Sequence, residues 1–267
     1  MVAPAQAMVA PAQAWVHDRR MGFAVQVRTA VARPARRRRL WALSAAIATI
    51  VLSNVMSNRI LPAWAYVPWN LTIAFVLLGI AYLGGSGPVA VGLGIRHWHR
   101  PVGVGLLLAG GTALIFALGM LLPATRNAFV DTRIGDAGVA GLLWVVLVQI
   151  PLGTVVLEEV AFRGVLPALL GASPAIRWRW WPVVAASVMF GLWHILPSIG
   201  INRANAAVGG ALGPDQWLTT TIAVAAMTLA GILLCALARL GKGIKTTMLV
   251  HWATNALGFF AAWLLVH

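Results

Sequence analysis

Two adjacent glutamates interrupt a long apolar stretch of this chain. The segment LEEVAFRG holds Glu158, Glu159 and Arg163, and its two glutamates are the only ones among 267 residues. Two histidines, His194 in SVMFGLWHI and His251 in LVHWATNAL, stand in similar apolar surroundings. Ionisable groups at membrane depth cost on the order of 3 kcal/mol each, so such residues are candidates for function.

Helical spacing gives the two glutamates different surroundings. Glu159 and Arg163 are four residues apart, where side chains on a helix meet at roughly 6 Å, and this order of charges favours an ion pair. Glu158 lies about 100° around the same helix and has no cation on it. The sequence therefore predicts that Glu159 is neutralised and that Glu158 is available for chemistry. The alternative is a structural role, in which all three residues clamp neighbouring helices.

Two further pairs share a helix face at the same spacing. Phe190 lies four residues before His194, and His251 lies four residues before Asn255. A carboxylate and an imidazole can hold and deprotonate a water, while a second imidazole and an amide can donate hydrogen bonds to a developing oxyanion. With Glu158, these residues indicate hydrolysis of an acyl bond without a protein nucleophile.

Two other kinds of site could use the same residues. Glu158, His194 and His251 form a possible zinc-ligand set, although the chain has no H-E-x-x-H motif. The hydrolytic interpretation requires no metal or cofactor. The same groups could instead relay protons in a proton-coupled transporter, or belong to a scaffold that binds a partner.

The composition indicates the elements that must carry these residues. Hydrophobic residues make up 60% of the chain and charged residues 10%, which is typical of a polytopic membrane protein. The apolar runs are continuous rather than alternating, which favours membrane helices over a β-barrel. We expect an all-α bundle of about seven spans. The apolar stretches are 40–57, 67–85, 101–122, 138–170, 180–197, 217–238 and 244–266.

The fourth stretch is too long for a single perpendicular span. As one helix, residues 138–170 would measure about 50 Å, against roughly 30 Å of hydrocarbon. Pro151 is expected to break this helix, because proline lacks the N–H group and clashes with the preceding turn. The membrane part would then be 150–170, with Glu158 at mid-depth. The hydrolytic hypothesis requires this depth, because Glu158 must meet His194.

Basic residues alternate between the two sides of the predicted membrane. Fifteen of the twenty precede the first span or lie on alternate loops, whereas four lie on the opposite loops and Arg163 lies within a span. The positive-inside rule then predicts a cytoplasmic N-terminus. The basic tail is expected to face the lipid bilayer rather than nucleic acid.

The chain divides into three expected regions. Residues 1–39 are predicted to be a basic, disordered cytoplasmic tail, 40–137 to form three N-terminal transmembrane helices, and 138–267 to form a four-helix catalytic core. The single cysteine, Cys235, excludes an intrachain disulfide and a cysteine-based metal cluster.

Three motifs in the last region resemble those of a known family. EEVAFR (E-E-x-x-x-R), FGLWH (F-x-x-x-H) and HWATN (H-x-x-x-N) occur in the order found in the CPBP family. This family includes the CAAX prenyl endopeptidases of the glutamate type and the bacterial Abi proteins, which are linked to bacteriocin processing and immunity. The resemblance covers residues 138–266 and implies a protease of a bacterial cell membrane, working without metal on a membrane-associated peptide or protein. A non-catalytic immunity protein is the alternative within the family.

The resemblance also implies a role for each motif residue. Glu158 with His194 would activate the water, whereas His251 and Asn255 would stabilise the oxyanion. The supporting residues would be Glu159, Arg163 and Phe190. The first two would buttress the site, and the phenylalanine would pack beneath it.

Overall fold

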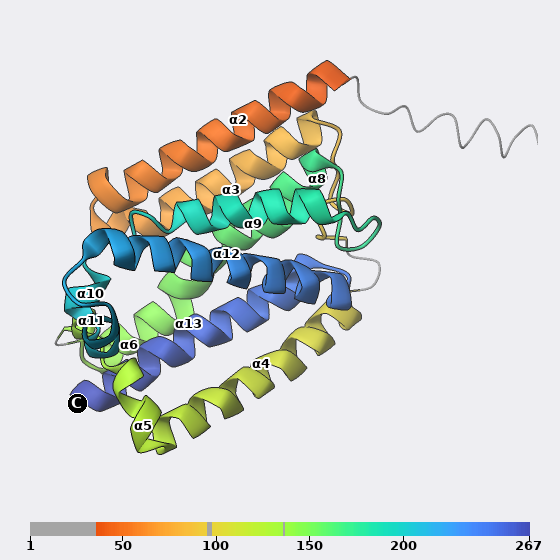
Figure 1. Cartoon of the computed structure of the whole chain (residues 1–267). Helices are drawn as coiled ribbons and strands as arrows, with labels where there is room; N and C mark the ends of the chain where they lie inside the picture. Colours follow the sequence, from red (N-terminus) through yellow and green to blue (C-terminus); the bar gives the residue numbers. More distant parts are fainter. Residues whose placement is uncertain (1–35, 95–97, 136) are drawn as a thin grey trace, which may run out of the picture. The chain divides into compact units, whose positions relative to one another are not determined.

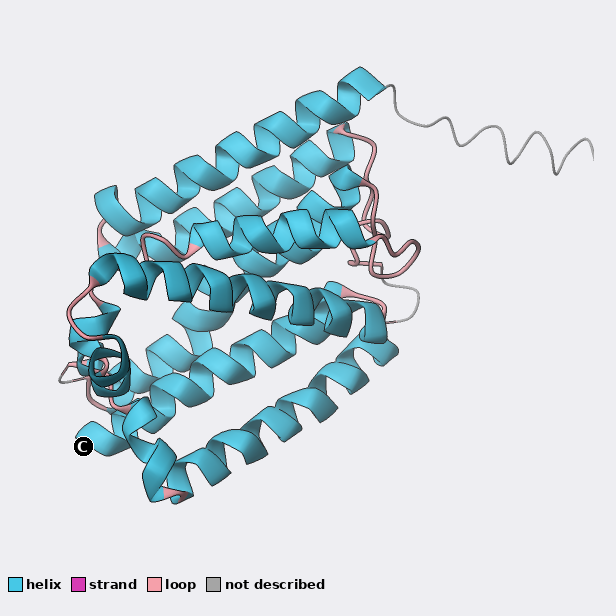
Figure 2. Cartoon of the chain, in the orientation of Figure 1, coloured by secondary structure: helices cyan, strands magenta, loops and turns pink. Residues whose placement is uncertain are grey.

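The computed structural model of the chain describes residues 36–94, 98–135 and 137–267 (Figure 1). These ranges consist of helices, turns and loops and contain no β-strand (Figure 2). The predicted all-α architecture is confirmed for this part of the chain. Most of the predicted tail, residues 1–35, lies outside the described residues.

Within the described ranges, six helices are long and apolar enough to cross a membrane: Arg36–Ile60, Ala63–Leu83, His99–Leu121, Val139–Leu170, Gln216–Gly241 and Ile244–Val266. A seventh apolar helix, Trp180–Trp193, has 14 residues, fewer than the roughly 20 that a perpendicular span needs. These lengths support an integral membrane protein. The seven predicted spans thus correspond to six long helices and a shorter one. The first begins at Arg36, four residues earlier than predicted.

Short connecting segments separate the long helices. The first half of the chain contains α2 (Arg36–Val55), η1 (Met56–Ile60), η2 (Ala63–Ala65), α3 (Tyr66–Leu83), α4 (His99–Leu121), α5 (Pro123–Arg126), η3 (Asn127–Phe129) and η4 (Thr132–Ile134). After the fourth long helix come α9 (Trp180–Trp193), α10 (Ile201–Ala204), α11 (Ala206–Leu212), α12 (Gln216–Gly241) and α13 (Ile244–Val266).

The fourth long helix is continuous, so the predicted break at Pro151 is wrong. Its successive parts are α6 (Val139–Trp144), η5 (Val145–Val155), α7 (Val156–Glu159), η6 (Val160–Val165) and α8 (Leu166–Leu170). Pro151 lies inside η5, which is π-helical, as is η6. The wider π turn alters the i−4 contact that makes proline disruptive in an α-helix, and π-helical turns are frequent at functional sites. The helix therefore carries Glu158 through the bundle without interruption.

The other long helices pack around the fourth helix and against one another. α13 contacts α4, α12 and η5, and α12 also contacts α9 (Figure 1). α9 and α12 approach closely at Gly191, where an added Cβ would lie 2.6 Å from the backbone oxygen of Val224. Only glycine allows this approach without a shift of the backbone.

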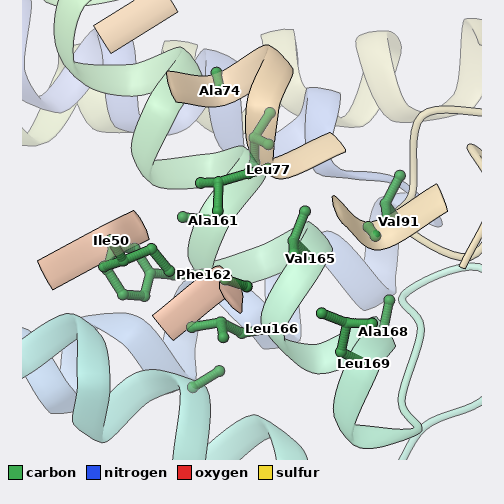
Figure 3. Packing of buried hydrophobic residues seen from close by; sticks show 14 of the residues in the cluster. Ile50, Ala74, Leu77, Val91, Ala161, Phe162, Val165, Leu166, Ala168 and Leu169 are labelled. Carbon is green, nitrogen blue, oxygen red and sulfur yellow. The ribbon is translucent and has the colours of Figure 1, made fainter. Parts of the chain in front are cut away.

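The hydrophobic core surrounds the second half of the fourth helix. Phe162 and Leu166 of this helix are almost completely buried, together with Leu77 of α3, Val91 of the following loop and Ile50 of α2 (Figure 3). Neighbouring helices thus enclose the segment that follows the two glutamates, which fixes its position in the bundle.

The two ends of the helical bundle differ in charge. One end, called here the basic end, carries Arg36–Arg39, Arg100, Arg177, Arg179, Arg239, Lys242 and Lys245. The opposite end carries Arg59, Arg126, Arg133 and Arg203, together with Asp131 and Asp215. Among the described residues, the basic end has no carboxylate. This distribution is the one from which the positive-inside rule predicts orientation.

Candidate functional site

A cavity of 680 Å³ lies between the fourth helix, α4, α9, α12 and α13. Its lining includes Glu158, His194, His251 and Asn255, the four residues predicted to be catalytic. The structure therefore brings these residues, from three helical elements, to one space. Much of the remaining wall is apolar and comes from α4 and α12: Leu107, Leu108, Ile115, Leu233, Leu234 and Leu237.

The course of the helices explains why Glu158 and His194 reach the same cavity. Glu158 lies 12 residues before Leu170, the end of α8, and His194 lies 14 residues after Trp180, the start of α9. Leu170 and Trp180 both lie at the basic end of the bundle. Glu158 and His194 are therefore about 18 and 21 Å, respectively, from that end along their helices. Their depths match although Pro151 does not break the helix.

Glu159 and Arg163 form the predicted pair inside the protein. The Nη1 atom of Arg163 lies 3.4 Å from Oε1 of Glu159, and both side chains are almost completely buried. The guanidinium also lies over the Phe190 ring, 3.9 Å from its centroid. An ion pair on one side and a cation–π contact on the other stabilise the charge of Arg163 away from water. Phe190 thus packs against Arg163 and also against the ring of His194.

His251 lies between the two glutamates. Its Nδ1 atom is 2.8 Å from Oε1 of Glu159, and its Nε2 atom is 3.7 Å from Oε2 of Glu158. A carboxylate is an acceptor only, so Nδ1–H donates to Glu159, which fixes the orientation of the ring. Nε2 is left to face Glu158. The sequence predicted the pairing of His251 with Asn255 on one helix face, but not this bridge between the glutamates.

Glu158 is held by side chains from other helices. Trp193 of α9 donates a hydrogen bond from Nε1 to Oε1 of Glu158, at 3.0 Å. The second oxygen, Oε2, has no hydrogen-bond partner among the described residues and is the one directed at His251. Glu158 is only 6% exposed, yet it lines the cavity. One oxygen is therefore fixed by Trp193, and the other is buried and faces His251.

His194 lies just beyond the end of α9, which is shorter than the predicted span to residue 197. In an α-helix the backbone N–H of His194 would bond to the carbonyl oxygen of Phe190. Here the backbone N–H bonds instead to Gly191, and Nδ1 of the ring lies 2.8 Å from the carbonyl oxygen of Phe190. A carbonyl accepts, so Nδ1 carries the proton and Nε2 is the basic nitrogen.

Three residues near Glu158 were missed by the sequence analysis. Trp193 is one, and the other two are Tyr66 and Thr154, whose hydroxyl oxygens lie 3.0 Å apart at the cavity wall. Thr154 could have been found, since it lies four residues before Glu158. Trp193 and Tyr66 act across helices, which spacing within one helix does not reveal.

α3 also supports the backbone of the fourth helix. Asn70, which is 1% exposed, donates a hydrogen bond to the carbonyl oxygen of Gly153 at 2.7 Å. The Tyr66 ring packs where Gly153 has no side chain, since a Cβ there would lie 2.8 Å from Tyr66 Cε1. The N-terminal helices therefore contribute to the site, in addition to the four-helix core that was predicted.

The zinc alternative requires at least three ligand side chains close together. Within the described ranges, no three side chains of His, Cys, Asp or Glu are grouped so that they could hold a metal ion. His251 is oriented by Glu159, and the Nδ1 atom of His194 is engaged by a backbone carbonyl. The hydrolytic arrangement fits these contacts directly.

Comparison with known proteins gives one family match. Residues 139–257 match the model of the Rce1-like family, described as type II CAAX prenyl endopeptidase Rce1-like. The matched segment begins at α6, ends within α13 and includes all three motifs of the site. No curated protein and no solved structure matches the chain.

Proposed function

We propose that this chain, whose residues 139–257 match the Rce1-like type II CAAX prenyl endopeptidase family, is an intramembrane endopeptidase. Its substrate would be a peptide bond in a membrane-associated polypeptide. The observation that carries the proposal is the buried cluster of Glu158, Glu159 and His251 at the wall of a cavity that also holds His194 and Asn255.

The proposed reaction begins with a water between Glu158 and His194. The carboxylate of Glu158 accepts a proton from this water, while Nε2 of His194 accepts its second hydrogen bond. The water oxygen adds to the peptide carbonyl carbon, and the carbonyl becomes an oxyanion. The proton then passes from Glu158 to the leaving amine nitrogen, the C–N bond breaks, and the carboxylate is restored. No covalent bond to the protein is needed.

The oxyanion would be stabilised from α13. The Asn255 amide and Nε2–H of a protonated His251 are the proposed donors. Charge balance supports this protonation state, because two carboxylates then meet two cations, Arg163 and His251, in one buried cluster. Glu159 and Arg163 act by holding His251 and Phe190 in place. They do not touch the substrate.

The cavity wall and the charge distribution support the proposed setting. Leucines and an isoleucine of α4 and α12 face the cavity, so a substrate with apolar groups would be favoured. We infer a cytoplasmic N-terminus and a bacterial cell membrane as the location. The basic end would face the cytoplasm.

Peptide cleavage by the purified protein tests the proposal. The protein in lipid nanodiscs is incubated with a panel of membrane-associated peptides, with and without a chelator, and the products are identified by mass spectrometry. Cleavage that persists with chelator is the expected result. Loss of cleavage with chelator would favour a zinc hydrolase. Proton-dependent solute uptake by proteoliposomes, without cleavage of any peptide, would favour a transporter.

A further inference from the structure

Two arginines meet around the end of α8, away from the cavity. Gly171 ends this helix with a φ of +100°, and the position of a Cβ on it lies 3.5 Å from Nη1 of Arg179 and 3.7 Å from Nη2 of Arg39. The two guanidinium nitrogens are thus no further apart than the sum of these distances, about 7 Å. Arg177 lies two residues before Arg179, on the loop that follows α8.

These like charges lack a compensating carboxylate in the described part of the chain. Asp131 and Asp215 lie at the opposite end, and the two glutamates lie about 18 Å away along the helix. Within the described ranges, the side chains of Arg177 and Arg179 have no hydrogen-bond or ion-pair partner. Arginines held this close together favour the binding of an anion.

The backbone holds the loop that carries two of these arginines. Ser173 and Arg177 exchange two backbone hydrogen bonds, of 2.6 and 3.2 Å. Arg239 of α12 donates from Nη1 to the carbonyl oxygen of Pro174 at 3.1 Å, and Arg39 donates from Nε to that of Leu169 at 2.6 Å. Arg177 and Arg179 therefore extend from a loop that Arg239 ties to α12, whereas Arg39 extends from α2 and is tied to α8.

The same loop presents apolar side chains to its surroundings. Ile176 is 63% exposed and Trp180 is 62% exposed, and the Trp180 ring packs edge-on against Trp178 at 5.2 Å. Exposed tryptophans beside arginines at the end of membrane helices are typical of the interface between hydrocarbon and headgroups. This setting favours a phospholipid headgroup over a soluble anion as the ligand.

We propose that Arg39, Arg177 and Arg179 bind the phosphate of an anionic phospholipid at the end of α8. Arginine guanidinium groups present paired N–H donors to phosphate oxygens. Arg39 already donates to the carbonyl oxygens of Ala168 and Leu169, so it would link the lipid to the helix that carries Glu158. The proposal concerns lipid binding and does not require peptidase activity.

Lipid binding to the purified full-length protein tests this site. Native mass spectrometry from detergent is used to titrate phosphatidylglycerol and phosphatidylcholine onto wild type, onto Arg177→Gln/Arg179→Gln and onto Arg36→Gln/Arg37→Gln. The last variant is the matched control, because it removes two exposed arginines from the same end but away from Gly171. The first variant should raise the Kd for phosphatidylglycerol about thirty-fold. The control should change it less than about three-fold.

Each of the following outcomes would contradict the proposed lipid site. Equal increases in the Kd for phosphatidylglycerol in the two double variants would mean that the basic end as a whole attracts the lipid without a specific site. Equal affinity for the two lipids would exclude recognition of the anion, and equally strong binding of inorganic phosphate alone would indicate a soluble ligand. Thermal unfolding checks that the variants fold. Should the double variant fail this check, Arg177→Gln and Arg179→Gln are titrated singly, and an unchanged Kd in both would reject the proposal.

Discussion

At the scale of single residues, Glu158 depends on side chains from two other helices. Trp193 holds one of its oxygens and His251 faces the other, while Glu159 orients His251 from behind. Each contact restricts the freedom of a group that the proposed reaction uses. Precise positioning of this kind contributes to catalysis because reacting groups are held close to the reactive geometry.

Replacement of Trp193 by phenylalanine should weaken catalysis while preserving the fold. The change removes the N–H donor to Glu158 and keeps an aromatic ring next to Phe162. A hydrogen bond to a charged group contributes about 1.5–3 kcal/mol, so kcat should fall about ten- to a hundred-fold. Steady-state cleavage kinetics measure this, with Trp217→Phe, at an exposed position, as the control. A folded Trp193→Phe protein with wild-type kcat would argue against this role.

At the scale of helices, α9 and α12 hold the histidine side of the site through close contact. Gly191 lies between Phe190 and His194 and faces the backbone of α12. Small residues at such contacts allow membrane helices to approach, and a larger residue forces them apart. The position of His194 therefore depends on a residue that has no chemistry of its own.

Replacement of Gly191 by alanine should destabilise the protein. The added Cβ would lie 2.6 Å from the backbone oxygen of Val224, and overpacking of this kind costs about 1–3 kcal/mol. Thermal unfolding in detergent should show a lower Tm, together with reduced cleavage. Gly110→Ala is the control, because no atom lies within 4 Å of its Cβ position. Equal Tm values for the two variants would contradict the close approach.

The sequence predicts the helices better than their details. All seven apolar stretches correspond to helices, and the pair of Glu159 with Arg163 follows from spacing alone. The predicted end of α9 was wrong because the His194 ring, rather than the His194 backbone N–H, bonds to the carbonyl oxygen of Phe190. The composition of the segment does not reveal this exchange. Pro151 was misjudged because the backbone adopts π turns around it.

Contacts between different helices could not be predicted from the sequence. Tyr66 and Asn70 come from α3, more than 80 residues before their partners on the fourth helix. No periodicity within a single helix can predict such pairs. A buried asparagine in an apolar span is nevertheless a usable signal, because a polar group in that position needs a partner.

At the scale of the whole molecule, charge distinguishes the two ends of the bundle. Among the described residues, ten arginines and lysines lie at the basic end, and four arginines accompany two aspartates at the other. By the positive-inside rule, this imbalance predicts that the basic end faces the cytoplasm. The proposed lipid site and the N-terminal end of α2 would then share that side.

Cysteine labelling at the two ends of α4 tests this orientation. In a Cys235→Ala background, Arg126→Cys should react with a membrane-impermeant maleimide in intact cells. Arg100→Cys should react only after the cells are permeabilised. Both positions are exposed, and they flank the same helix, so each serves as the control for the other. The reverse pattern of labelling would place the basic end outside.

The most direct test of the account is the cleavage rate of Glu158→Gln. This change keeps the size of the side chain and an acceptor for Trp193, but it removes the group proposed to take the proton from water. With a peptide that wild type cleaves, kcat should fall at least about a hundred-fold while the Tm changes little. A folded Glu158→Gln protein that cleaves at the wild-type rate would contradict the central role of this glutamate.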